Sequence, residues 1–205
     1  MENMGDKKIA RMEGSLEGNL LIAMPTISDG CFARSVVYMC AHSEEGAMGL
    51  IVNQAAPGVA FPDLLEQLDI VEDDYCVGAP SAVHTRTVHV GGPVETSRGF
   101  VLHSPDYFVA SSSVRVQDGI CLTATLDILK AMLSGNGPER ALLALGYAGW
   151  SPGQLEAEIS HNGWLHCQAE PDLVFDTELD TKYQRALSQL GVADLSHLVN
   201  DAGHA

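Results

Sequence analysis

The apolar residues of this chain fall mostly into short continuous runs that end at glycine, proline or polar residues. Runs of roughly four to eight residues with such ends are typical of strands buried in a sheet. The pattern predicts strands at residues 20–24, 35–41, 46–52, 87–90, 99–103, 114–116, 120–123, 141–145, 164–167 and 173–175. The run at 141–145 also suits a helix by propensity, but its shortness and continuous apolarity favour an interior strand.

Helical spacing of apolar residues occurs in fewer places. It predicts helices at residues 61–68, 126–133 and 177–190. A further helix is predicted after the glycine-rich end of the run at 145–150. There Ser151 is a suitable N-cap, Pro152 suits the first helical position, and Gln154 completes a capping box. The acidic residues 72–74 are expected to end the first helix.

Turn residues suggest how these elements connect. Asp118 and Gly119 predict a tight hairpin between their flanking strands, and residues 42–46 predict another. The strands at 87–90 and 99–103 are expected to pair with each other. No repeat or linker interrupts the pattern, so a single α+β domain over residues 16–205 is predicted after a flexible segment at 1–15.

Composition and charge narrow the function classes. The chain has 205 residues, 46% of them hydrophobic, and a net charge of −16 from 27 acidic and 11 basic residues. Such a charge repels phosphate backbones, so we expect no nucleic-acid partner, and the acidic surface suits solubility better than a docking role. No apolar run is long enough for a membrane span, so we expect no association with a membrane. The five cysteines include no C-x-x-C pair and indicate no disulfide framework, so a cytoplasmic protein is expected.

Signatures of familiar catalytic and cofactor sites are absent from the sequence. There is no G-x-S-x-G, no G-x-x-x-x-G-K-[ST], no H-E-x-x-H and no G-x-G-x-x-G. His161, His166 and Cys167 have ligand chemistry, but adjacent residues on a strand face opposite sides of a sheet. We therefore expect neither a metal nor a cofactor.

Polar residues at the predicted element ends form the candidate ligand-binding set. A local anion pocket could arise where arginines meet histidines and a Gly-Gly turn. The set is Asp29, Arg34, His42, Asn53, Gly91, Gly92, Arg98, His103 and Trp150. In the structural alternative, Asp29 pairs with Arg34, the histidines bond backbone carbonyls, Asn53 stabilises a turn and Trp150 fills the core.

Several blocks in order resemble the YqgE/AlgH family, which is labelled as transcriptional regulators and has no settled biochemical activity. They are Leu16-Glu-Gly-Asn-Leu-Leu-Ile-Ala-Met-Pro25, Arg34-Ser-Val-Val-Tyr38, Gly46-Ala-Met-Gly-Leu50, Gly91-Gly-Pro-Val94, Arg98-Gly-Phe-Val-Leu-His103 and Leu145-Gly-Tyr-Ala-Gly-Trp150. The resemblance implies a strongly bent, mixed and mostly antiparallel sheet that is partly barrel-like, with helices around it. Tyr183 departs from the tryptophan expected from the family pattern.

Three hypotheses follow, and the sequence leaves the oligomeric state open. The first is a non-catalytic regulatory protein that recognises a small anionic ligand or a protein partner. The second is an enzyme of unassigned class, such as a hydrolase, with His42 or His103 as general base. The third is direct DNA binding through Arg86, Arg98, Arg115 and Arg140, which the net charge opposes.

Overall fold

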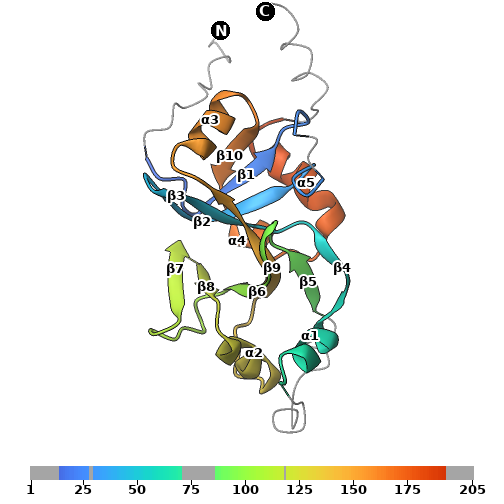
Figure 1. The fold of residues 1–205 in the computed structure, drawn as a ribbon. Helices are drawn as coiled ribbons and strands as arrows, with labels where there is room; N and C mark the ends of the chain where they lie inside the picture. Colours follow the sequence, from blue (N-terminus) through green and yellow to red (C-terminus); the bar gives the residue numbers. More distant parts are fainter. Residues whose placement is uncertain (1–13, 28–29, 71–85, 118, 193–205) are drawn as a thin grey trace, which may run out of the picture.

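The computed structural model describes residues 14–27, 30–70, 86–117 and 119–192 (Figure 1). This part of the chain forms ten strands and five helices. In chain order they are β1 (Asn19–Ala23), β2 (Val36–Ser43), β3 (Gly46–Ile51), β4 (Ala55–Ala60), α1 (Phe61–Gln67), β5 (Thr87–Val90), β6 (Val94–His103), β7 (Ser113–Gln117), β8 (Ile120–Thr123), α2 (Leu126–Leu133), β9 (Ala141–Trp150), α3 (Gln154–Ser160), β10 (Trp164–Gln168), α4 (Pro171–Val174) and α5 (Leu179–Gln189).

All the strands belong to one curled sheet. Its main order is β10-β1-β2-β3-β9-β6-β8-β7, with β5 beside β9 and β4 beside β5. Every pairing is antiparallel except that of β5 with β9. Figure 1 shows α3 beside β10 at one end of the molecule, and α1 and α2 at the other. The α+β fold with a bent, mostly antiparallel sheet, which the family resemblance implied, is confirmed.

The central strands are buried on both faces, which explains their continuous apolar runs. Leu20, Ile22 and Tyr38 pack into one core cluster, beneath α4 and α5. Their strand neighbours Leu21 and Val37 point the opposite way into a second cluster, beneath α3. A third cluster joins α1 and α2 to β5, β6 and β9. Because side chains alternate along a strand, both sides of β1 and β2 must be apolar.

The predicted pairing of residues 87–90 with 99–103 is wrong, because β9 lies between these strands. β5 pairs with one edge of β9 and β6 with the other. The chain passes from one edge to the other at Gly91 and Gly92, directly against the backbone of Gly146 and Tyr147. A Cβ on Gly92 would lie 2.1 Å from the carbonyl carbon of Tyr147, and one on Gly91 would lie 2.1 Å from the oxygen of Gly146. Only glycine fits at this crossing.

Two further predictions are corrected. Residues 173–175 form no strand, because residues 171–174 are the short helix α4. Pro171 suits the first turn of a helix, and the helix places the Leu173 side chain in the core. Ser151 is not the N-cap of α3, which begins at Gln154 after Gly153 in a left-handed conformation (φ 74°). Half of the capping box does form, since the Gln154 side chain accepts the backbone N–H of Ser151 at 3.0 Å.

The other predicted helices and strands agree with the structure within about two residues, except that β6 begins five residues before the predicted 99–103 and β9 ends five residues after the predicted 141–145. The hairpins β2–β3 and β7–β8 are also confirmed. β4 was not predicted, since its sequence Ala-Ala-Pro-Gly-Val-Ala has no alternating pattern.

Some predictions concern residues that the structure does not describe. These are the segment at 1–13, Asp29, the acidic residues 72–74 and Asp118. Among those described, no helix is long and apolar enough to cross a lipid bilayer.

The crossing at β9 predicts a position-specific effect of methyl groups. Gly92→Ala should lower the free energy of unfolding by about 3 kcal/mol, since backbone atoms must move to admit the new methyl group. Gly99→Ala in β6 is the matched control, because its Cβ would meet only a Leu143 methyl at 3.9 Å. Urea denaturation of both variants measures the difference. Equal stability of the two would contradict the close crossing.

Candidate functional site

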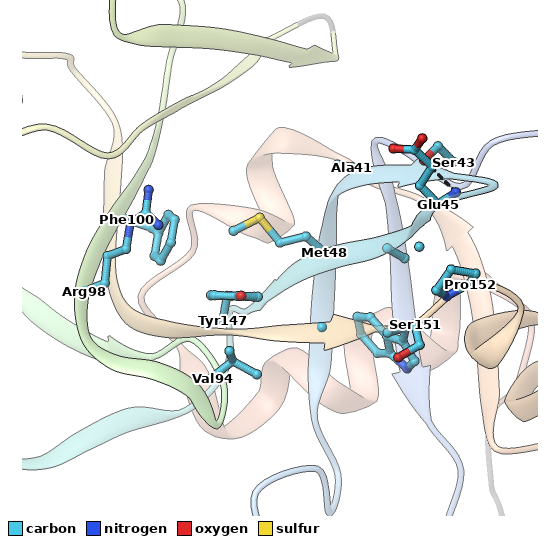
Figure 2. Close-up of a pocket in the computed structure, with 14 residues that line it drawn as sticks. Ala41, Ser43, Glu45, Met48, Val94, Arg98, Phe100, Tyr147, Ser151 and Pro152 are labelled. Carbon is cyan, nitrogen blue, oxygen red and sulfur yellow. Dashed lines mark hydrogen bonds between the residues drawn. The ribbon is translucent and has the colours of Figure 1, made fainter.

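An open cleft of about 690 Å³ lies between the β2–β3 hairpin, the end of β9 and β6 (Figure 2). We call it the hairpin cleft. Its lining residues are Ala41, Ser43, Glu45, Gly46, Ala47, Met48, Val94, Arg98, Phe100, Tyr147, Gly149, Trp150, Ser151 and Pro152. Most of these side chains are apolar or aromatic, so the cleft offers a surface for apolar groups.

The middle of the hairpin cleft is apolar and its two ends are charged. Met48, Phe100 and Tyr147 lie in the middle, with the rings of Phe100 and Tyr147 edge to face at 5.8 Å (Figure 2). At one end, Arg98 lies over Phe100 and pairs with Glu95 at 3.0 Å. At the other end, Glu45 is exposed and makes no ion pair within the described part of the chain.

The structure distributes the predicted ligand set over several places. Arg98 and Trp150 line the hairpin cleft. Arg34 packs instead over the ring of Tyr183 in α5, 4.8 Å from its centre. Asn53 accepts the N–H of Val36 at 2.8 Å and donates to the carbonyl of Arg34 at 2.9 Å, which is a turn-stabilising role.

The remaining members of the set have structural contacts, or lie outside the described residues. Gly91 and Gly92 form the backbone crossing over β9 and are absent from the lining of the cleft. Asp29 is not among the described residues. Ligand binding by the predicted set therefore stays a prediction, although Arg98 and Trp150 do share one cleft.

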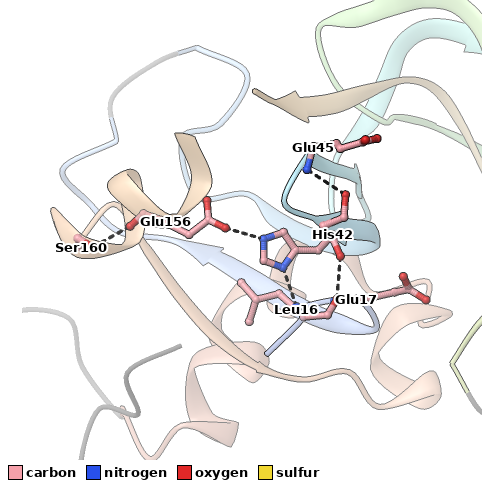
Figure 3. A network of polar contacts seen from close by, with 8 residues as sticks. Leu16, Glu17, His42, Glu45, Glu156 and Ser160 are labelled. Atoms are coloured by element: carbon pink, nitrogen blue, oxygen red, sulfur yellow. Dashed lines mark hydrogen bonds and ion pairs between the residues drawn. The ribbon is translucent and has the colours of Figure 1, made fainter. Parts of the chain in front are cut away.

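His42 has both ring nitrogens occupied (Figure 3). Its Nδ1 accepts the backbone N–H of Leu16 at 2.9 Å, so the proton of the neutral ring is on Nε2. That Nε2–H donates to Glu156 at 2.9 Å. A bond from its own backbone N–H, followed by the bond from His42, keeps the pKa of Glu156 below its usual value, against the opposing effect of burial. Both ring nitrogens of His42 therefore have partners within the protein.

His103 is also saturated, by a buried chain of hydrogen bonds. The N–H of Val109 donates to the Ser113 hydroxyl at 3.1 Å, and that hydroxyl lies 2.8 Å from the hydroxyl of Thr123. Thr123 in turn lies 2.9 Å from His103 Nε2, while His103 Nδ1–H donates to the carbonyl of Ser104 at 2.9 Å. Burial lowers the pKa of His103. The chain ties β6, β7 and β8 together and leaves no lone pair for catalysis.

A second hollow, of about 550 Å³, lies on the other side of Trp150 and contains a cluster that the sequence did not predict. One oxygen of Glu158 accepts the indole N–H of Trp150 at 2.9 Å and that of Trp164 at 2.8 Å. Its other oxygen accepts the amide of Gln154 at 2.9 Å. Phe32 packs against both indoles. The i, i+4 spacing of Gln154 and Glu158 on α3 was the available signal, but nothing local linked Glu158 to two tryptophans.

The remaining sequence candidates are the arginines considered for DNA binding and the residues with metal-ligand chemistry. Arg140 pairs with Asp172 at 2.8 Å, which neutralises part of the predicted basic patch, and Arg115 lies over the ring of Phe108. His161 bonds the carbonyl of its own helix. Within the described ranges, no group of three or more His, Cys, Asp or Glu side chains has a metal-binding arrangement.

The Glu158 cluster predicts a joint stability and fluorescence effect. Glu158→Ala removes the acceptor of two indoles that are only 7% and 3% exposed, so it should cost about 3 kcal/mol of unfolding free energy and shift the tryptophan emission. These are the only two tryptophans in the sequence, so the emission reports this cluster alone. Glu66→Ala, on the exposed side of α1, is the control. Identical emission and stability for both variants would rule out the shared acceptor.

Comparisons with known proteins place the chain in a family. A family model described as AlgH-like matches residues 20–194. A UPF0301 protein of Afipia carboxidovorans is 61% identical over 190 residues, which cover 93% of this chain and 90% of that protein. The solution structure of the AlgH protein of Pseudomonas aeruginosa superposes with a TM-score of 0.72 at 38% identity, over all of both chains. A crystal structure of DIP2367 from Corynebacterium diphtheriae has the same fold, with a TM-score of 0.68 at 22% identity over 88% of this chain and 90% of that one. The chain therefore belongs to the AlgH-like family.

Proposed function

We propose that this protein is a non-catalytic regulatory protein of the cytoplasm, which binds a segment of a partner protein in the hairpin cleft. The observation that carries the proposal is the apolar middle of an open cleft, with the Glu45 carboxylate at one end, which makes no ion pair with any described residue. Open apolar grooves of this kind take up side chains of a bound peptide, while charges at the ends set its direction.

The charges favour a segment that combines basic and apolar residues. Arg98 is already compensated by Glu95, so it offers little net charge to an anion. Glu45 has no such partner among the described side chains, and the whole chain carries −16. A basic segment is attracted over long range by this field, and its approach to Glu45 adds a local contact.

The histidine geometry supports binding over the enzymatic alternative. A general base needs a free lone pair within reach of the substrate. Both nitrogens of His42 and both of His103 already have partners within the protein. The regulatory label of the family is compatible with an action on another protein, without contact between this acidic chain and DNA.

A peptide selection tests the proposal. Random peptides displayed on phage are selected on the immobilised full chain, and the enriched peptides are synthesised and titrated. We expect sequences that combine Lys or Arg with aromatic or aliphatic residues. Met48→Lys should weaken their binding roughly tenfold or more, because it removes an apolar contact and adds a like charge.

The control variant separates a local effect from a change in net charge. Val114→Lys makes the same change of charge at an exposed position of β7, 60% accessible, and should leave the affinity unchanged. The proposal fails if acidic peptides are enriched, if no peptide is enriched above background, or if both lysine variants bind as tightly as the wild type.

A further inference from the structure

A smaller pocket, of about 290 Å³, lies between β5, the start of β9 and the connection from α4 to α5. We call it the β5 pocket. Arg86, His89, Phe175 and Asp176 are among its lining residues. None of these lines the hairpin cleft, so the site is independent of the proposed partner binding.

His89 lines this pocket and carries an unused acceptor. The side chain is 6% exposed, and its Nδ1–H donates to the carbonyl of Leu143 at 3.2 Å. Burial, followed by the nearby charge of Lys182, lowers the pKa of His89 to about 4, so the ring is neutral near pH 7. Its Nε2 is then a buried lone pair without a hydrogen-bond partner in the described structure. Such an atom loses its hydration and gains nothing in return.

Arg86 presents an unused donor at the same pocket. Its Nη1 donates to the carbonyl of Ala141 at 3.2 Å, whereas its Nε–H is buried and has no partner among the described residues. The side chain is half-buried, and within the described structure this is its one hydrogen bond, so a rotation can bring Nε to a ligand. Within the described structure, Arg86 Nε–H thus lacks an acceptor, for which an anion is suited, and His89 Nε2 lacks a hydrogen-bond donor.

Lys182 adds positive charge behind the pocket. It is fully buried in α5, and its ammonium donates to the carbonyls of Val52 and Val174, both at 2.9 Å. No carboxylate of the described residues lies within ion-pair distance of it. Asp176 is the nearby acid, but it is already bonded to Arg185 and to the N–H of Glu178. The local balance is therefore positive inside a strongly acidic protein.

We propose that the β5 pocket binds a phosphate group, either free or in a monoester, through one charged and one protonated oxygen. The charged oxygen accepts Arg86 Nε–H, and the P–OH donates to His89 Nε2. Within about one pH unit of its second pKa, which is about 6, a phosphate group is present in a form that carries both kinds of oxygen. Sulfate has the same shape but no proton to donate, so it would leave His89 unsatisfied.

The test compares three anions with the full chain by isothermal titration calorimetry at fixed ionic strength and neutral pH. Inorganic phosphate and glycerol 3-phosphate should bind, and sulfate should bind at least tenfold more weakly. Binding by the monoester alone would identify a phosphorylated metabolite, and binding by both would identify the phosphate group itself. Equal binding of sulfate, or no binding of either phosphate at millimolar concentration, would overturn the proposal.

Variants assign the binding to the pocket. Arg86→Gln and His89→Leu should each weaken phosphate binding roughly tenfold or more. Arg115→Gln, which removes an exposed arginine on β7, should have no effect. If His89→Leu does not fold, the ¹⁵N resonance of His89 Nε2 in the wild type gives the same information, since it should move on addition of phosphate and stay unchanged with sulfate. Unchanged affinity in Arg86→Gln, or an unmoved resonance, would rule out this pocket.

Discussion

Gly91 and Gly92 lie directly against the backbone of β9, and this close contact determines the order of the strands around β9. It lets consecutive strands occupy opposite edges of β9, so that this strand pairs with β3, β5 and β6. After the crossing, β6 departs from regular register between Val94 and Gly99. Within this irregular part of β6, Glu95 has a φ of +47° and pairs with Arg98, which lines the end of the hairpin cleft. The crossing thus contributes one wall of the cleft.

The sequence predicted the elements well wherever burial dictated the residue pattern. Strands β1, β2 and β3 are continuous apolar runs because both of their faces are covered, and α2 and α5 show helical spacing because one face is covered. The predictions were wrong where tertiary contacts determined which strands pair or which secondary structure forms. Nothing local in the Gly91-Gly-Pro93 segment reveals that a strand 50 residues later separates its neighbours. Leu173 and Val174 of the run predicted as a strand are helical, because Pro171 begins the short helix α4.

The candidate site was harder to predict, because its contacts join residues that are distant in sequence. His42 was a reasonable choice, but its partner Glu156 lies 114 residues away, and only the folded structure shows that both ring nitrogens have hydrogen-bond partners. Glu158 and Trp164 carried no signal of a shared hydrogen bond. Lys182 lies between polar residues of an amphipathic helix, where a lysine is normally exposed, and its burial follows from the carbonyls that meet it.

The distribution of the basic residues links the proposed interactions to the overall charge. Most of the described arginines contact an aromatic ring or a carboxylate, which leaves little cationic surface and favours a basic partner outside. Arg86 and Lys182 differ, since both direct hydrogen bonds into the protein at backbone carbonyls. A carbonyl satisfies a donor but does not neutralise its charge, so positive charge persists there. The two proposals therefore rest on charges of opposite sign: the proposed anion would complement the positive charge of the interior, and the proposed basic segment would complement the negative charge of the surface.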